Sequence, residues 1–111
     1  MIQRYKNRYV LVESSFQSGM SDRHAESEII GAMAAEMGNT GFLEANPKIV
    51  HRPSEYTFIM RINRGYERKA VLALSFVRSV GGKKAALYTI KTSGTIRSLI
   101  DFCRKAYAQD A

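Results

Sequence analysis

The sequence is poor in the residues on which disulfide, metal or membrane chemistry depends. It contains a single cysteine, Cys103, so no intramolecular disulfide can form, and neither His24 nor His51 has partners at metal-ligand spacing. No apolar run approaches the roughly 20 residues that a membrane-spanning helix needs. The N-terminal stretch MIQRYKNRYV lacks the apolar segment of a signal peptide. We therefore expect a cytoplasmic protein without a membrane partner, a disulfide or a structural metal.

Negative charge is scarce in the second half of the chain. Residues 1–60 hold six Lys or Arg and seven Asp or Glu, whereas residues 61–111 hold eleven and three. The net charge is therefore −1 in the first part and +8 in the second. Such an asymmetry produces a directional field that favours a polyanionic partner, such as a nucleic acid.

Hydrophobic periodicity predicts one domain over residues 1–111, with elements in the order β-α-β-β-α-β-α. Strands are expected at residues 8–16, 42–52, 56–64 and 84–92, and helices at about 22–38, 66–80 and from 96 onward. The first six elements predict a split βαββαβ, ferredoxin-like and RRM-like α+β fold, with a four-stranded antiparallel sheet and both helices on one face. The C-terminal helix must then lie at an edge of the sheet or across its open face.

The segment KTSGTIR, residues 91–97, joins the last strand to the last helix. A glycine followed by a hydroxyl residue at a helix start presents free backbone N–H groups, which together with Lys91 and Arg97 would attract a phosphate. Ordinary helix capping by Thr95 explains the same residues without a ligand. Both interpretations stay open, so Ser93, Gly94 and Thr95 are candidate phosphate ligands.

Other cations are candidates for contacts with RNA phosphates. They lie in a tyrosine-rich N-terminal segment, around the end of the third strand and after a double-glycine turn: Arg4, Lys6, Arg8, Arg61, Arg64, Lys83 and Lys84. Solvated cations also cover proteins that bind nothing anionic. Because residues 56–64 lack the RNA-recognition-motif signature, contacts with the backbone of folded RNA are expected in place of base stacking on the sheet.

Two other functions fit the same order of elements. A ferredoxin-like small-ligand-binding regulatory domain is one, although its usual ligands do not call for a charge of +7. An acylphosphatase is the other, with Arg23 and Asn39 loosely placed for that role. The Gly-rich phosphate loop of acylphosphatases has no match in the SSFQSGMSDRH segment, and the sequence shows no acid/base pair. No catalytic residue is therefore predicted.

Three segments together resemble a known family: RYVL at residues 8–11, FIMRINRGYERKAVLALSFV at 58–77 and SGTIR at 93–97. They are similar to archaeal ribonuclease P protein component 2, a family shared with the small sheet-containing subunit of eukaryotic ribonuclease P and MRP. The resemblance runs from about Arg8 to Lys105, and SGTIR is its most specific part.

The resemblance implies a noncatalytic RNA-binding subunit of a ribonucleoprotein, the endonuclease complex that removes the 5′ leader from precursor tRNA. In that complex the hydrolase chemistry belongs to Mg²⁺ ions on the RNA, so the protein itself is expected to bind no cofactor. The implied partners are ribonuclease P RNA, precursor tRNA and the barrel-shaped ribonuclease P protein component 3. A homodimer or a 2:2 heterotetramer with component 3 is also consistent with the family.

Overall fold

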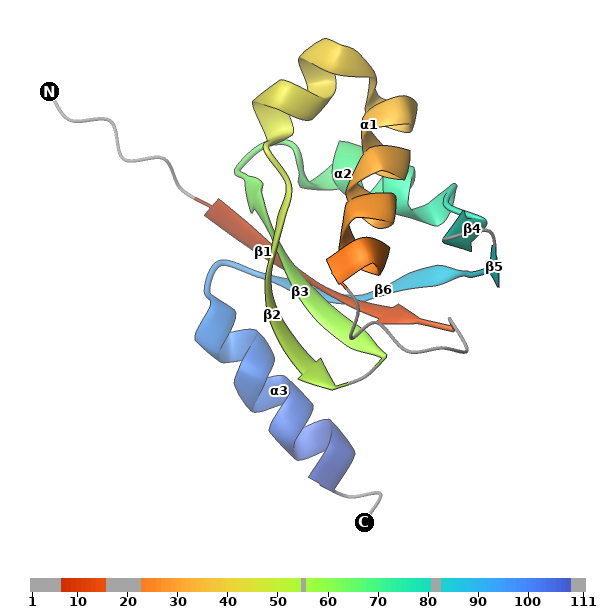
Figure 1. Cartoon of the computed structure of the whole chain (residues 1–111). Helices are drawn as coiled ribbons and strands as arrows, with labels where there is room; N and C mark the ends of the chain where they lie inside the picture. Colours follow the sequence, from red (N-terminus) through yellow and green to blue (C-terminus); the bar gives the residue numbers. More distant parts are fainter. Residues whose placement is uncertain (1–6, 16–22, 55, 81–82, 109–111) are drawn as a thin grey trace, which may run out of the picture.

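The computed structural model describes residues 7–15, 23–54, 56–80 and 83–108 (Figure 1). Its elements are β1 (Asn7–Ser14), α1 (Arg23–Ala45), β2 (Lys48–Ser54), β3 (Thr57–Asn63), α2 (Glu67–Ser75), β4 (Ser79–Val80), β5 (Lys83–Lys84), β6 (Leu87–Ser93) and α3 (Ile96–Ala108). The main sheet has the order β2-β3-β1-β6 with every neighbouring pair antiparallel, while β4 and β5 pair separately. This is the predicted split βαββαβ arrangement, and the expected α+β fold is confirmed.

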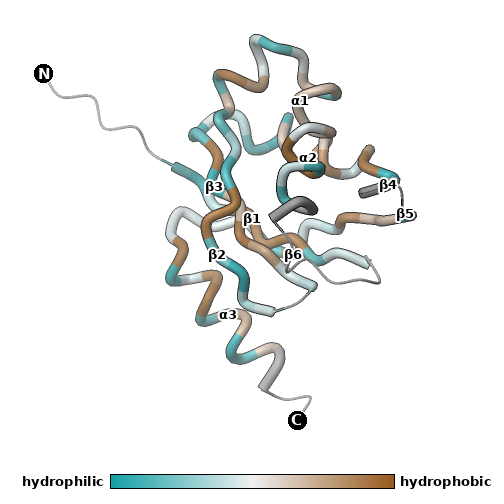
Figure 2. The backbone as a smooth tube through the Cα atoms, in the orientation of Figure 1, coloured by the Kyte–Doolittle hydropathy of each residue, from teal (hydrophilic) through white to brown (hydrophobic). Residues whose placement is uncertain are grey.

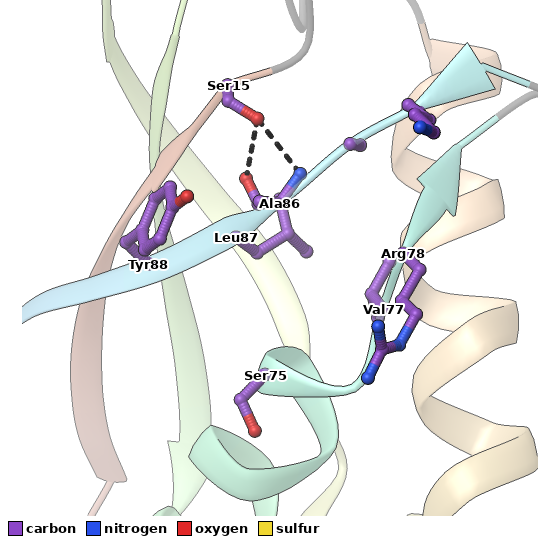
Figure 3. A pocket seen from close by; sticks show the side chains of 9 residues that line it. Ser15, Ser75, Val77, Arg78, Ala86, Leu87 and Tyr88 are labelled. Atoms are coloured by element: carbon purple, nitrogen blue, oxygen red, sulfur yellow. Dashed lines mark hydrogen bonds between the residues drawn. The ribbon is translucent and has the colours of Figure 1, made fainter.

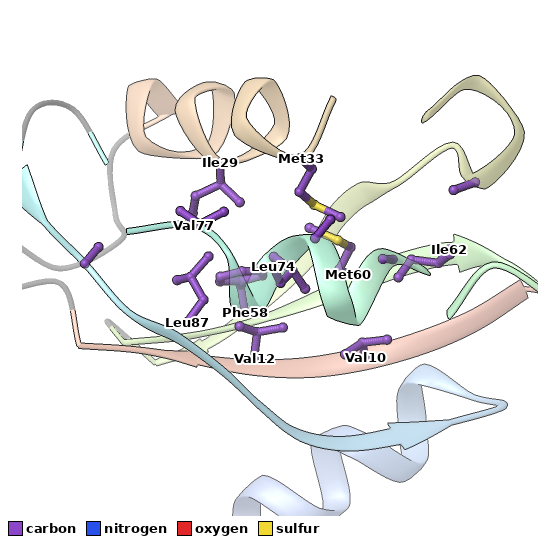
Figure 4. Close-up of a cluster of buried hydrophobic side chains, with 14 residues drawn as sticks. Val10, Val12, Ile29, Met33, Phe58, Met60, Ile62, Leu74, Val77 and Leu87 are labelled. Atoms are coloured by element: carbon purple, nitrogen blue, oxygen red, sulfur yellow. The ribbon is translucent and has the colours of Figure 1, made fainter. Parts of the chain in front are cut away.

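Helices cover both faces of the sheet. Successive strand residues point to opposite faces, so Val10 and Val12 join the large cluster between the sheet and helices α1 and α2 (Figure 4). Leu11 lies instead in a second cluster, with Leu99 and Cys103 of α3. The predicted alternation in β3 is confirmed in the same way. Its even-numbered apolar residues pack toward α1 and α2, and Ile59 packs toward α3. The face left open in the prediction is thus partly covered by the C-terminal helix.

The C-terminal helix is confirmed at its predicted start and is strongly amphipathic. Figure 2 shows hydrophobic and hydrophilic residues alternating along α3. Leu99 and Cys103 are four residues apart and therefore lie on one side of the helix, where both are buried. Within the part of the chain that the structure describes, no helix is both long and apolar enough to cross a membrane.

The start of the second strand was predicted wrongly, whereas the predicted helix end at Gly38 is confirmed. Gly38, with φ 77° and ψ 164°, interrupts the helix there, and a second helical segment, included in α1, continues to Ala45. Two residues stop the helix after Ala45. Asn46 has a positive φ of 46°, and Pro47 has no N–H to donate. The strand predicted from residue 42 therefore begins at Lys48. It includes Pro53, which an edge strand such as β2 tolerates.

The second helix is shorter than its apolar spacing indicates. Helix α2 ends at Ser75, and the segment predicted to continue it to residue 80 turns away to form β4. Leu72, within α2, and Phe76, directly after it, are about half exposed, at 58% and 50%. The last strand of the sheet begins at Leu87, because Lys83 and Lys84 pair with β4 and not with β1.

Candidate nucleic-acid interface

One end of the sheet gathers most of the predicted site residues. Strand β1 begins there and β3 and β6 end there, because neighbouring strands are antiparallel (Figure 1). Helix α3 starts at the same end, and two residues, Gly94 and Thr95, connect it to β6. The predicted residues at or near this end are Arg8, Arg61, Arg64, Lys91, Ser93, Gly94, Thr95 and Arg97.

A small cavity at this end is lined by Asn7, Arg8, Arg64 and Gly94 and has a volume of about 280 Å³. Gly94 does not adopt a positive φ, so a left-handed backbone conformation does not explain the glycine at this position. A Cβ placed on Gly94 would lie 3.5 Å from Nη1 of Arg8, so the guanidinium lies directly beside the glycine. The cavity therefore combines two guanidinium groups, a side-chain amide and an uncovered stretch of backbone, all of which suit an oxyanion.

Glu67, at the start of α2, fixes the position of Arg8. Its Oε2 lies 3.4 Å from Nε of Arg8, and Gly65 donates its backbone N–H to Oε1 of the same carboxylate. Burial alone would raise the pKa of Glu67, but the N–H groups of Glu67 and Gly65 and the charges of Arg8 and Arg64 together lower it. Glu67 thus stays ionised and holds one edge of the Arg8 guanidinium, whereas Nη1 faces Gly94.

The Ser-Gly-Thr junction is capped by its own side chains. Thr95 donates its backbone N–H to Oγ of Ser93 at 3.2 Å, and Ser98 donates its backbone N–H to Oγ1 of Thr95 at 3.2 Å. The expected role of Thr95 as a helix cap is confirmed. Capping does not use every N–H at a helix start, since the first four have no partner within the helix. The positive end of the α3 dipole therefore remains directed toward this end of the sheet.

Strand register divides the predicted residues between the two faces of the sheet. Arg61 and Ser93 both pair with Tyr9, so all three lie on the face that α3 covers. Lys91 pairs with Leu11 on that face, and its Nζ lies 4.9 Å from the centre of the Phe102 ring of α3. Arg8 and Arg64 belong instead to the cavity described above. The predicted site therefore consists of two adjoining parts, one on the rim of the sheet and one on its α3 face.

Lys83 and Lys84 lie at the opposite end of β6, about 20 Å away for a strand of this length. Lys84 lines a depression of about 1000 Å³ there, together with Ser15, Ser75 and Arg78 (Figure 3). Since all four of these residues are exposed, the depression is open to solvent and is not an enclosed ligand cavity. The structure thus separates these two lysines from the other predicted residues. Arg4 and Lys6 fall outside the described residues.

Three residues that contact or pair with predicted site residues were not predicted from the sequence. Lys48 pairs with Arg61 across β2 and β3, Glu67 contacts Arg8, and Phe102 lies under Lys91. The two residues of each pair are at least eleven positions apart in the sequence, so the spacing of neighbouring residues does not predict the pair. Pairing β2 with β3 across their short connection would have placed Lys48 near Arg61, had the start of β2 been predicted correctly.

The fold and this end of the sheet define the class: a small split βαββαβ protein with a cationic edge. Among the described residues, no group of three or more His, Cys, Asp or Glu could hold a metal ion. The family model described as Rpp14/Pop5 family matches residues 8–104. The chain therefore belongs to the Rpp14/Pop5 family.

Similar proteins carry the name "Ribonuclease P protein component 2". The protein from Methanocorpusculum labreanum is 32% identical over 96 residues, which are 86% of this chain and 65% of that protein. The one from Pyrococcus horikoshii is 32% identical over 98 residues, 86% of this chain and 81% of that protein. A third, from Methanoculleus marisnigri, is 31% identical over 97 residues, 86% of this chain and 60% of its own length. The chain spans less than two thirds of the Methanocorpusculum and Methanoculleus relatives.

A solved structure has the same fold. A chain in the cryo-EM structure of yeast Ribonuclease MRP aligns with a TM-score of 0.66, covering 99% of this chain and 97% of that one. The two sequences are 10% identical, so this likeness concerns the fold alone.

Proposed function

We propose that this chain is a noncatalytic RNA-binding protein subunit of ribonuclease P, the enzyme that removes the 5′ leader of precursor tRNA. One observation carries the proposal: cations from β1, β3, β6 and α3 meet at one end of the sheet in a member of the Rpp14/Pop5 family. The name shared by its relatives supports the same assignment.

The proposed mechanism is electrostatic. Arginine and lysine side chains at the cationic end neutralise closely spaced phosphates of the ribonuclease P RNA and release their counterions. Neutralised phosphates repel one another less, so the folded RNA needs less Mg²⁺, while Mg²⁺ ions held by the RNA carry out hydrolysis. The protein stabilises the catalytic RNA in this way and binds no cofactor itself.

The proposed partners follow from the same assignment. They are ribonuclease P RNA, precursor tRNA and ribonuclease P protein component 3, in a cytoplasmic complex with one or two copies of each protein. Leu72 of α2 and Phe76, directly after the helix, are exposed apolar side chains that a companion protein could cover.

Reconstituted cleavage of precursor tRNA tests the proposal. Arg97→Ala should raise the Mg²⁺ concentration needed for half-maximal cleavage without moving the cut site. Lys91→Ala should raise it less, because the Phe102 ring already engages that ammonium group. Lys105→Ala is the matched control, since Lys105 is exposed and lies about 12 Å further along α3.

The double variant of Lys91 and Arg97 gives the decisive result. If it folds and reconstitutes with the Mg²⁺ requirement of the wild type, these two residues do not belong to the RNA interface. Equal losses in the Lys105→Ala control would show that total charge, and not its position at the sheet end, determines binding.

A further inference from the structure

A row of side chains crosses the α3 face of the sheet just before α3 begins. Lys48 pairs with Arg61, Arg61 with Tyr9 and Tyr9 with Ser93, so one residue from each of the four strands lies in register. Neighbouring strands are about 4.8 Å apart, and the row therefore spans about 14 Å. We call these four residues the basic row.

The basic row is accessible and carries uncompensated positive charge. Lys48 is exposed, and the other three residues are half-buried. No member is a carboxylate, and neither the ion pair of Arg8 with Glu67 nor that of Arg52 with Glu26 involves the row. The charges of Lys48 and Arg61 are therefore free to meet an external anion.

The surroundings of the row favour a narrow ligand. The next row along the sheet contains Leu11 and Ile59, which are fully buried beneath α3. Because a helix is about 10 Å across with its side chains, α3 forms a wall of about that height on one side of the row. The wide surface of an RNA duplex cannot easily reach half-buried groups at the foot of such a wall, whereas a single strand can.

The chemistry of the row matches a single RNA strand. Cations that track phosphates, interleaved with an aromatic ring against which a base or ribose can pack, are what proteins use for unpaired nucleic acid. Lys48 and Arg61 supply the charge, Tyr9 the ring, and Ser93 leads into the N-terminus of α3. We propose that an unpaired segment of RNA crosses the sheet along the basic row, with phosphates on Lys48 and Arg61 and one nucleoside against Tyr9. This inference rests on the proposed function.

Binding to two fluorescent probes tests the inference: an oligouridine of about 10 nucleotides and a fully paired hairpin of equal charge. Lys48→Ala and Arg61→Ala should each weaken oligouridine binding about three- to tenfold and reduce its salt slope by about 0.7. Tyr9→Leu keeps an apolar contact with α3 but should weaken binding about fivefold or more. Arg61→Lys should retain most of the affinity, and Lys105→Ala should leave it unchanged.

Crosslinking provides a second, positional measurement. Irradiation of the wild type with a 4-thiouridine-substituted oligouridine should attach the probe to Tyr9 or its sequence neighbours. Circular dichroism and thermal unfolding of each variant should match the wild type, since none of the substituted side chains is fully buried.

The outcomes separate this inference from the proposed function. If the hairpin binds as tightly as oligouridine and the variants weaken both equally, the row contacts duplex RNA and the inference is overturned. If row variants bind oligouridine like the wild type while Arg97→Ala still raises the Mg²⁺ requirement of cleavage, the inference is overturned and the proposed function stands. If wild-type protein binds no ribonuclease P RNA at all, the proposed function fails first.

Discussion

Replacing Glu67 by Gln tests the geometry around Arg8 most directly. The carboxylate lies 3.4 Å from Arg8 Nε, where two unit charges attract by about 1 kcal/mol in a water-like medium and about 5 kcal/mol at an effective dielectric constant of 20. The side chains of Arg8 and Glu67 are 37% and 24% exposed, so screening reduces the net value to about 1 kcal/mol or less. Glutamine keeps an oxygen that can accept the N–H of Gly65.

The same charge opposes any phosphate that enters the cavity beside Arg8. Removing it should therefore strengthen binding of ribonuclease P RNA about three- to fivefold, while lowering the free energy of unfolding by no more than about 1 kcal/mol. Fluorescence anisotropy at several salt concentrations measures the first effect, which should shrink as salt screens the charges. Denaturant unfolding measures the second. Unchanged or weaker RNA binding by the folded variant would refute the placement of a phosphate beside Arg8.

Acid provides an independent check on the same ion pair. Because the pKa of Glu67 is lowered in the folded state, its stabilising contribution is present above the ordinary glutamate pKa and is lost as pH falls through the lowered value. The Gln variant should lack this part of the acid-induced loss. Thermal unfolding followed from neutral pH to below pH 4.5 should therefore show the two proteins converging as acid is added. Parallel curves would show that Glu67 contributes nothing through its charge.

Substitutions at four further positions have expected outcomes. Gly94→Ala should change the free energy of unfolding by no more than about 1 kcal/mol, because its Cβ makes only ordinary contact with Arg8. The added methyl group should weaken RNA binding by occupying the space beside the Arg8 guanidinium, and unaltered binding would exclude the cavity as a phosphate site. Thr95→Ala should cost about 1 kcal/mol in denaturant unfolding through the lost cap, and Thr95→Ser should restore it. Leu99→Ala should cost about 2–5 kcal/mol, whereas Leu72→Ala, at a 58% exposed position, should cost less than about 0.5 kcal/mol; similar values would contradict the packing of α3.

Patterns that depend on neighbours in the chain were predicted well. The alternation of Phe58, Ile59 and Met60 is a property of one strand, and the apolar spacing from Ile96 to Cys103 belongs to one helix, so both are visible without the fold. The element boundaries that were predicted wrongly lie where the sequence is compatible with both a helix and a strand. Gly38 does interrupt the helix, but a second helical segment follows it up to Asn46, where the sequence indicated a strand.

The candidate site was predictable in its residue types but not in its geometry. SGTIR identifies the junction, yet which cations share a face follows from strand register, which no local pattern contains. Arg8 and Arg61 are both near a strand end, but one faces α2 and Glu67 whereas the other faces α3 and Lys48. Lys84 was grouped with them because of its charge, and the separate β4–β5 pairing places it at the far end of the sheet.

The attachment of α3 through a few apolar side chains gives the molecule a built-in chemical reporter. Cys103 is its sole thiol, its side chain lies on the buried side of that helix, and burial raises its pKa, so both access and ionisation limit its alkylation. A thiol reagent would modify the folded chain mainly during moments when α3 lifts from the sheet. Comparing the rate of Cys103 labelling with and without RNA would therefore measure how much bound RNA reduces the separation of α3 from the sheet.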